Sequence, residues 1–441
     1  MTTFDLVLRG GTIVSHAGAG AGDIGMRGGK IVAIGDLAQA GGPVFDARGL
    51  HILPGVIDTQ VHFREPGNEH KEDLETGTRA AALGGVTGVF EMPNTAPPTT
   101  SAQALHDKVA RAKGRAHVDH AFYAGATHEN AEHLSEIERT PGCCGVKTFM
   151  GSSTGTLLVG DDDGLDRVIK NINRRGAFHA EDEDRLNERK KLAREGDWTS
   201  HPEVRDDQAG LIAVKHLVEK ARKYGKRVHV LHVSSAIEMD YLATAKDVAT
   251  VETLPQFLTF EGPEIYERLK GFAQMNPPIR YAADRAALWD LGITQGVVDI
   301  IATDHAPHTK EEKAQPYPKS PSGMPGVQTL VPVMLTHVNE GRLSLQRFVD
   351  LSSAGPQRVF GIEGKGRIAL GYDADFTVVD MAARRVIRAE DQATRCGWTP
   401  FDGFEAKGWP MATIIRGQIV MRDGELTTPS AGEPLRFLET L

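Results

Sequence analysis

The sequence predicts an α/β fold: a closed (β/α)8 TIM-like barrel joined to a small β-sandwich that both chain ends form. Apolar, strand-like runs alternate with helical patterns through the middle of the chain, which is typical of repeated β-α units and a parallel sheet. Eight such runs favour a closed barrel over an open sheet. Short strand patterns with glycine-rich turns stand at both ends of the 441 residues, a length that accommodates a barrel and one smaller unit.

Both ends of the chain carry the pattern of small β structure. Short alternating apolar runs fill residues 4–53, and the same pattern returns at residues 375–380 and 413–420. We therefore expect the two ends to pair with each other. The predicted division places residues 1–54 and 367–441 in the β-sandwich and residues 55–366 in the barrel.

The strands and helices of the barrel can be placed along the middle of the chain. Ser101 is expected to cap a helix that starts at residue 102, and apolar residues spaced three and four apart predict another helix that ends before Gly225. The predicted barrel strands are 56–63, 87–92, 117–123, 144–149, 176–179, 227–232, 249–254 and 298–303. In this fold the catalytic groups lie where strands end, at the C-terminal face of the barrel.

Composition and charge exclude several classes of partner. The net charge of −9 comes from 59 acidic and 50 basic residues mixed along the chain, a pattern that does not suit nucleic acid or an anionic membrane. The N-terminus lacks a signal-peptide pattern, and no apolar segment reaches the roughly 18 residues of a membrane span. We expect a cytoplasmic protein that acts on a small molecule. Cys143, Cys144 and Cys396 are too few for a disulfide framework and are expected to be buried.

Polar side chains gather at the predicted strand ends. Asp58, Gln60 and His62 are spaced two apart, so they point to the same side of the first strand, and Arg64 follows directly. Other strand ends supply Asn94, Lys147, His179, His232, Asp304 and His308. A lone histidine at such a position is usually structural, whereas this convergent set predicts a metal centre at the barrel top. Gln60 is unexpected, because an imidazole would be the better ligand.

Five motifs follow one another along the chain. They are Asp58-x-x-x-His62-Phe63-Arg64-Glu65-Pro66-Gly67 with His70-Lys71-Glu72-Asp73, then Met92-Pro93-Asn94-Thr95, Asn276-Pro277-Pro278-Ile279-Arg280, Asp304-His305-Ala306-Pro307-His308 and Gly371-x-x-Ala374-Asp375. In this order they resemble the motifs of the dihydroorotases, which belong to the amidohydrolase superfamily. The resemblance covers nearly the whole chain.

The resemblance implies a zinc centre with one or two ions. The implied ligands are His62, Lys147, His179, His232, Asp304 and, as a weak ligand, Gln60. The imidazoles would bind zinc in their neutral form. Lys147 would be carboxylated by carbon dioxide, because an ammonium cannot bind a cation whereas a carbamate can bridge two metals. An amide oxygen is a poorer zinc donor than imidazole, so the position that includes Gln60 is expected to be weakly or partly filled.

The resemblance also implies roles in catalysis and substrate binding. Asp304 would take a proton from the attacking water and return it to the leaving amide nitrogen. A guanidinium can hold a carboxylate through paired charge-assisted bonds, so Arg64 would bind a carboxylate of the substrate. The implied substrate-binding residues are Arg64, Asn94 and His308 around that carboxylate, and Asn276, Ser322 and Gly323 along the amide edge of the ring.

Simpler interpretations exist for three of these residues. Lys147 would then be a snorkelling or ion-paired lysine in an apolar strand. Arg64 would form an exposed ion pair with Glu65 or Glu69, a kind of contact that is common and weak. Asp304 would cap a helix at a strand–helix junction. The convergence of the strand ends favours the functional interpretation of all three.

Three functional hypotheses follow. The resemblance implies a zinc-dependent dihydroorotase, which cyclises N-carbamoyl-L-aspartate to L-dihydroorotate reversibly in pyrimidine synthesis. A hydantoinase or allantoinase is the alternative enzyme, although their typical rings lack the carboxylate that Arg64 would bind. A non-catalytic, dihydroorotase-like partner of aspartate transcarbamoylase is the third hypothesis, and Gln60 is its main support. The family also leads us to expect a homodimer.

Overall fold

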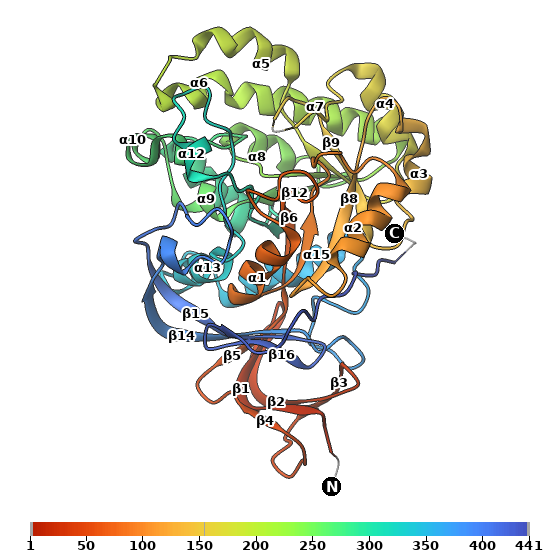
Figure 1. Ribbon diagram of the computed structural model, residues 1–441, viewed down its shortest axis with the longest axis vertical. Coiled ribbons are helices and arrows are strands. Elements are labelled where there is room, and N and C mark those ends of the chain that lie inside the picture. The colour runs from red at the N-terminus through yellow and green to blue at the C-terminus, as the bar shows by residue number, and fades with distance from the viewer. Residues whose placement is uncertain (1–2, 154, 439–441) are drawn as a thin grey trace.

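The computed structural model describes residues 3–153 and 155–438, which form a barrel with a separate sheet beneath it (Figure 1). Within these residues, eight parallel strands pair in chain order. They are β6 (Val56–Val61), β7 (Val86–Glu91), β8 (Asp119–Gly125), β9 (Cys143–Phe149), β10 (Gly176–His179), β11 (Val228–Val230), β12 (Ala249–Thr253) and β13 (Ile300–Ile301). The amide of His62 donates to the carbonyl of His305 at 2.7 Å and joins the two ends of this sheet. The predicted barrel is confirmed.

Helices cover the outside of the barrel and connect its strands (Figure 1). They are α1 (Leu74–Leu83), α2 (Ala102–Ala112), α3 (Leu134–Ile137), α4 (Asp162–Asn171), α5 (Glu183–Arg189), α6 (His201–Val204), α7 (Asp207–Tyr224), α8 (Ala236–Ala243), α9 (Pro255–Thr259), α10 (Glu264–Leu269), α11 (Ala282–Ala287), α12 (Lys310–Lys313), α13 (Leu330–Asn339), α14 (Leu345–Val349) and α15 (Gly355–Phe360). The two predicted helix ends are confirmed. The Ser101 hydroxyl accepts from the amide of Ala104 at 3.2 Å, and Gly225 ends α7 in the left-handed conformation at a φ of 60°.

Strands from both chain ends form the second sheet. They are β1 (Leu6–Ser15), β2 (Gly18–Arg27), β3 (Lys30–Gly35), β4 (Val44–Asp46), β5 (His51–Pro54), β14 (Phe376–Val386), β15 (Glu405–Ile415), β16 (Gln418–Arg422) and β17 (Glu425–Leu426). The pairing of β5 with β14 joins the two ends of the chain. Leu8 and Ile24 from one end share an apolar core with Phe376 and Ile414 from the other. The predicted pairing is therefore confirmed, while the domain boundaries after residues 54 and 366 stay predictions.

Two segments of the C-terminal region reach back to the barrel. Residues 387–404, between β14 and β15, approach the C-terminal face, where the indole of Trp398 donates to the carbonyl of His308 at 2.8 Å. Residues 432–438 pass the opposite end, where the amide of Leu435 donates to the carbonyl of His120 at 2.9 Å. The terminal region thus contacts both faces of the barrel.

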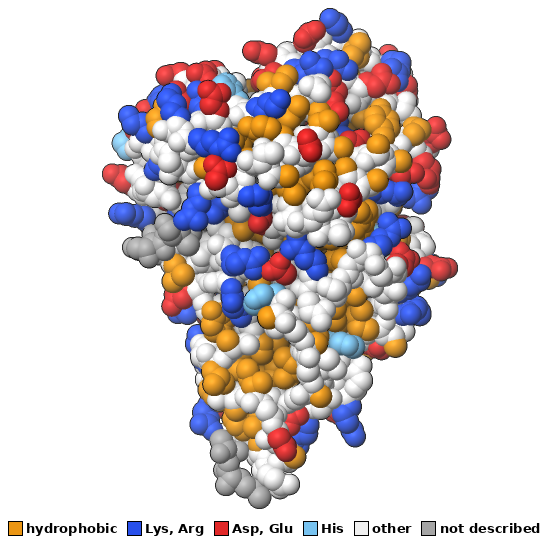
Figure 2. All heavy atoms as spheres, turned by 180° about the vertical axis from the view of Figure 1, so that it is seen from behind, with side chains coloured by type: hydrophobic (Ala, Val, Ile, Leu, Met, Phe, Trp, Pro, Cys, Tyr) orange, Lys and Arg blue, Asp and Glu red, His pale blue; other side chains and the backbone are white. Residues whose placement is uncertain are grey.

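The surface and the cysteines agree with the sequence. Acidic and basic side chains are interspersed over the face that Figure 2 shows. Cys143, Cys144 and Cys396 are buried free thiols, as predicted. Among the helices in the described part of the chain, none has the length and apolar character needed to cross a membrane.

Candidate active site

The predicted site residues converge at the C-terminal ends of the barrel strands. A cavity there is lined by Gln60, His62, Arg64, Asn94, Lys147, Phe149, Ser153, His179, His232, Asn276, Asp304, Ala306, Ser322 and Gly323. Every predicted site residue except His308 belongs to this lining, and His308 lies beside Arg64 with its Nε2 3.2 Å from the guanidinium. The strand-end argument therefore locates the cavity correctly, while the role of each residue stays a prediction.

His62 and Asp304 form one half of the site. His62 Nε2 lies 3.0 Å from Asp304 Oδ1, and His62 Nδ1 lies 2.7 Å from Oδ1 of Asn94. Gln60 Nε2 donates to the same oxygen of Asp304 at 3.0 Å. The buried Oε1 of Gln60 has no hydrogen-bond partner among the described residues. Gln60 therefore orients Asp304 with its amide nitrogen and leaves its amide oxygen available as a ligand.

His179 and His232 form the other half. His179 Nδ1 lies 3.0 Å from His232 Nε2, and His179 Nε2 lies 2.8 Å from Oε2 of Glu181. Arg205 donates to the same Glu181 oxygen at 2.5 Å. Burial acts to raise the pKa of Glu181, but Arg205 and His179 outweigh it and hold the pKa below the ordinary value. A charged carboxylate on one ring nitrogen fixes the other nitrogen toward His232, the usual arrangement for a metal-ligating histidine.

Glu181 and Arg205 were not assigned a role from the sequence. Glu181 stands two residues after His179. In an extended chain this spacing puts both side chains on the same side, as it does for Gln60 and His62 in the first strand. Arg205 lies 24 residues further along the chain, and no local pattern connects it to Glu181.

Lys147 lies at the end of β9 and is buried. Its Nζ has no hydrogen-bond partner among the described residues, and burial lowers its pKa to about 7. Burial, and to a lesser extent the Lys147 charge, also lowers the pKa of His62, His179 and His232. The three imidazoles are therefore neutral near pH 7, which is the form that binds a metal.

The donor set fits a metal centre that Lys147 completes. Among the described residues, no three His, Cys, Asp or Glu side chains meet closely enough to hold a metal. The donors form two pairs instead, and the charge of Lys147 acts on the histidines of both. Zinc takes at least three protein ligands in its usual sites. A carbamate on Lys147 would supply the missing oxygen to each pair, which would account for a buried amine that has no hydrogen-bond partner among the described residues and lies 4.4 Å from the ring centre of Phe149.

Three site residues have a backbone conformation that is rare outside glycine. The φ angles are 63° at Arg64, 39° at His232 and 47° at Asp304. Such a conformation costs about 1–3 kcal/mol per residue, and it persists where the surrounding structure imposes it, most often at functional sites. The surrounding structure therefore holds these three residues in place, and the left-handed backbone of Asp304 differs from the β-region backbone of a helix N-cap.

Arg64 is buried and faces the cavity. Its Nε donates to the carbonyl of Pro307 at 3.1 Å, and one terminal nitrogen lies 3.2 Å from Nε2 of His308. No ion pair joins it to Glu65 or Glu69 among the described residues, so the surface salt-bridge interpretation is wrong. Burial lowers the pKa of Arg64 to about 10, so the guanidinium is still charged at neutral pH.

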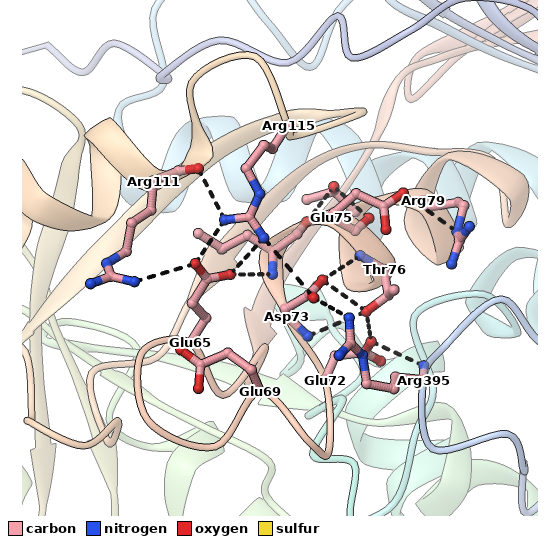
Figure 3. Close-up of polar contacts among 12 residues, drawn as sticks. Glu65, Glu69, Glu72, Asp73, Glu75, Thr76, Arg79, Arg111, Arg115 and Arg395 are labelled. Carbon is pink, nitrogen blue, oxygen red and sulfur yellow. Dashed lines mark hydrogen bonds and ion pairs between the residues drawn. The ribbon is translucent and has the colours of Figure 1, made fainter.

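The acidic residues of the loop before α1 belong to a separate network (Figure 3). Glu65 accepts from Arg115 at 2.7 Å, and Glu72 accepts from the backbone amide of Arg395 at 3.0 Å. Asp73 pairs with the Arg395 side chain and caps α1. These contacts connect the loop after β6 to the residues that follow α2 and to the segment between β14 and β15, and so they anchor the loop that begins at the cavity.

One wall of the cavity is built from backbone that needs glycine. Gly323 has a φ of 137°, and a Cβ added there would lie 2.5 Å from the carbonyl oxygen of Ala306. Asn276 completes this wall, with its Oδ1 3.1 Å from Nε2 of His201. The wall is therefore close-fitting, and a side chain at position 323 would displace it.

The buried Lys313 supports this wall of the cavity through hydrogen bonds. Lys313 Nζ donates to the carbonyl oxygens of Gln274, Pro321 and Gly323 at 3.0, 2.7 and 2.8 Å. The three acceptors use all three N–H groups of an ammonium. Lys313 thus connects the segment before Asn276 to the loop of Gly323, and nothing in the sequence alone indicated this role.

Comparison with known proteins shows the family to which the chain belongs. Residues 49–147 match the Dihydro-orotase-like family, and residues 272–420 match the Amidohydrolase family. A dihydroorotase of Halobacterium salinarum is 38% identical, and the match covers 94% of this chain and 96% of that protein. The chain belongs to the dihydroorotase-like amidohydrolases.

Other relatives of this amidohydrolase have different names. An allantoinase of Rubrobacter xylanophilus is 35% identical over 99% of this chain and 98% of its own length. The solved structure of an L-hydantoinase from Arthrobacter aurescens has a TM-score of 0.93 and 28% identity, and it covers 98% of this chain and 99% of that one. The amidohydrolase is therefore a hydrolase that acts on a cyclic amide bond.

Proposed function

We propose that this amidohydrolase is a zinc-dependent dihydroorotase, which interconverts N-carbamoyl-L-aspartate and L-dihydroorotate in de novo pyrimidine synthesis. Arg64 carries the proposal, because it lines the cavity as a buried, charged guanidinium whose hydrogen-bond partners among the described residues are a backbone carbonyl and a neutral imidazole. A buried charge is costly unless an opposite charge pairs with it. A carboxylate on the substrate is the counter-ion that matches the planar fork of a guanidinium.

This requirement separates the candidate substrates. Dihydroorotate carries a carboxylate on its ring, whereas hydantoin and allantoin do not, so only the first would neutralise Arg64. Burial, followed by the charge of Arg64, lowers the pKa of His308 to about 3, so His308 is neutral and can contribute only a hydrogen bond. Asn94 lines the same cavity and offers a neutral amide. Arg64 is thus the residue expected to decide specificity.

The two donor pairs define where zinc would bind. His62, Asp304 and, weakly, Gln60 would hold one ion, and His179 with His232 would hold the other. Carboxylated Lys147 would contribute an oxygen to each. Zinc bound there would polarise the scissile carbonyl and make water a better nucleophile near pH 7.

Asp304 is proposed as the proton carrier of the reaction. It lines the cavity, and the amide nitrogen of Gln60 holds one of its oxygens at 3.0 Å. A carboxylate held in this way can accept the proton of the attacking water and deliver it to the ring nitrogen that leaves. The same oxygen lies 3.0 Å from Nε2 of His62. Zinc binding and proton transfer would therefore both depend on one orientation of the Asp304 carboxylate.

Substrate competition tests the proposal. The zinc-loaded protein should turn over dihydroorotate with a higher kcat/KM than hydantoin or allantoin. Arg64→Met should lower kcat/KM for dihydroorotate about 30- to 1000-fold, the effect of removing one member of a buried charge pair. It should change turnover of an uncharged ring far less. Arg111→Met is the matched control, because Arg111 is partly exposed and does not line the cavity.

Two results would reject the proposal in favour of named alternatives. Preference for hydantoin or allantoin would make the protein a hydantoinase or allantoinase, which the fold similarity to L-hydantoinase and the allantoinase relative favour. Absence of turnover in protein with bound zinc would indicate a non-catalytic relative. We further propose a cytoplasmic homodimer. Sedimentation alone and in mixtures with aspartate transcarbamoylase would test the dimer and an association with that enzyme.

A further inference from the structure

A second cavity lies at the end of the barrel opposite the candidate active site, where β10 and β11 begin. Its volume is about 170 Å³, and it is lined by Asn173, Arg175, Gly225, Lys226, Arg227, Arg358 and Val359. Four of these seven residues are basic and none is acidic, in a protein whose net charge is −9. This space is well above the roughly 10–15 Å³ that a single water molecule needs, and it is enough for a small anion. The charge of the lining is therefore opposite to that of the whole protein.

Arg175 is the innermost charge of this cavity. One of its terminal nitrogens donates to the carbonyl of Val228 at 3.4 Å and to the hydroxyl of Thr250 at 3.3 Å. Its Nε is buried and has no hydrogen-bond partner among the described residues. Asp299 is the acid whose charge acts on Arg175, and Lys246 already pairs with Asp299 at 2.5 Å. Arg175 thus lacks an acidic partner of its own.

The other basic residues of the cavity differ in whether they have a hydrogen-bond or ion-pair partner. Lys226 donates to the carbonyl of Ile172 at 2.6 Å, at the end of α4, and Arg358 pairs with Asp350 at 2.7 Å. Arg227 forms no ion pair with an acid in the part of the chain that the structure describes. Its charge acts on Arg175, so the two guanidiniums repel each other across the cavity. Two of the four basic groups therefore lack a counter-charge.

We propose that this cavity binds a small multivalent oxyanion, the phosphate or diphosphate group of a phosphorylated metabolite. An oxyanion between Arg175 and Arg227 would offset their repulsion, and its several oxygens match the forked donors of guanidiniums. Basic residues also suit the carboxyl ends of helices such as α4 and α7. The helix dipole explains why Lys226 lies at the end of α4, but it provides no acceptor for the buried Nε of Arg175. The inference is independent of the cyclic amide that the enzyme hydrolyses.

Anion titration of the full-length, zinc-loaded protein tests this site. Inorganic phosphate and pyrophosphate would be titrated by calorimetry at constant ionic strength, with chloride as the reference anion. Arg227→Ala should weaken binding about tenfold or more, the effect of losing a charge-assisted hydrogen bond. Arg227 is exposed, so the variant should fold normally and melt at the same temperature without anion. Phosphate bound beside Arg64 would be unaffected, so this loss reports on the second cavity alone.

Arg222→Ala is the matched control. Arg222 is an exposed arginine in the last turn of α7, and it pairs with Asp247 at 2.8 Å outside the cavity lining. Its removal changes the net charge by the same amount as Arg227→Ala, and phosphate affinity should stay at the wild-type value. Equal affinities in wild type and Arg227→Ala would overturn the proposal. An equal loss in both variants would also overturn it, because the effect would then be one of overall charge.

Discussion

Gln60 occupies a position where an imidazole would complete the second donor pair. In the structure its amide nitrogen holds Asp304, while its amide oxygen has no hydrogen-bond partner among the described residues. The nitrogen would support the proposed role of Asp304 in proton transfer, and the oxygen would offer a weak ligand. A glutamine at this position therefore does not by itself indicate a catalytically inactive protein.

Gln60→His should add metal to the site. Imidazole is a better zinc ligand than an amide oxygen, so the pair formed by His62 and Asp304 would gain a firm third donor. Metal analysis of protein purified with zinc should show about one additional equivalent per chain relative to wild type. Gln60→Leu provides the comparison, since it removes both amide functions and should lower activity without adding metal. An unchanged zinc content in Gln60→His would show that residue 60 does not limit the second position.

Carboxylation of Lys147 should depend on pH. Burial lowers the pKa of Lys147 to about 7. The amine is protonated below that pH and becomes neutral, and able to attack carbon dioxide, above it. In the metal-free protein, the carbamate signal in carbon-13 spectra with labelled bicarbonate should therefore rise as the pH increases through about 7. Lys147→Met should show no such signal, and a signal of equal strength at pH 5 and pH 9 would contradict the assignment.

The same shift affects stability. An unfolded lysine titrates near pH 10.4, whereas folded Lys147 titrates near 7, so the unfolded state binds one more proton between these values. The metal-free protein should therefore become less stable as the pH falls from about 10 to about 7, with no further contribution from Lys147 below that range. Urea titrations of wild type and Lys147→Met across this range would show the difference.

At the scale of elements, the short helix α12 supports the wall of the cavity. Lys313 is buried at its end and donates to three backbone carbonyls on two segments, those of Gln274, Pro321 and Gly323. The indole of Trp398 lies on the neighbouring side, with its ring centre 5.9 Å from the Lys313 ammonium. The helix is short, but its last residue connects it to two segments that contribute to the cavity lining.

Lys313→Met should weaken substrate binding more than catalysis. It keeps the apolar stem but leaves the carbonyls of Pro321 and Gly323 without a donor, which should cost about 2–4 kcal/mol of stability, while Gln274 still accepts from the amide of Gly323 at 2.9 Å. Because these two carbonyls flank the cavity wall, KM for dihydroorotate should rise about tenfold while kcat changes less. Lys310→Met is the control, since Lys310 is exposed on the same helix. A loss of stability with an unchanged KM would make Lys313 a structural residue only.

The positions of residues at strand ends or in loops explain which contacts could be predicted from the sequence. Strand ends share one face in a barrel, so residues such as Lys147, His232 and Asp304 could be brought together without coordinates. Lys313 and Arg205 could not, because their partners are set by loops that no periodicity describes. The second cavity was missed for the same reason. Arg175 precedes a predicted strand and Arg227 begins the next one, but the sequence does not show that both lack acidic partners.

At the scale of the whole molecule, the two ends of the chain pair in the terminal sheet, and the C-terminal end also covers one end of the barrel. The strand β5 leads directly into the first barrel strand, β6, and pairs with β14, which follows the last barrel helix. After the sheet, the chain returns to the barrel, where Leu435 joins the apolar cluster of Phe90, Tyr123 and Phe360. The C-terminal segment thus covers the interior of the barrel at the end opposite the candidate active site.

Leu435→Ala should destabilise the barrel although it lies near the C-terminus and far from the cavity. Leu435 is 2% exposed, and truncating a buried leucine costs about 2–5 kcal/mol through lost apolar contact and the hole left behind. Leu438→Ala is the matched control, because Leu438 is 45% exposed and its loss should cost about 0.5 kcal/mol or less. The free energies of unfolding from urea titration give both values. If Leu435→Ala and Leu438→Ala proved equally mild, residues 432–438 would lie loosely on the barrel, and its interior would be sealed by Phe360 and its neighbours alone.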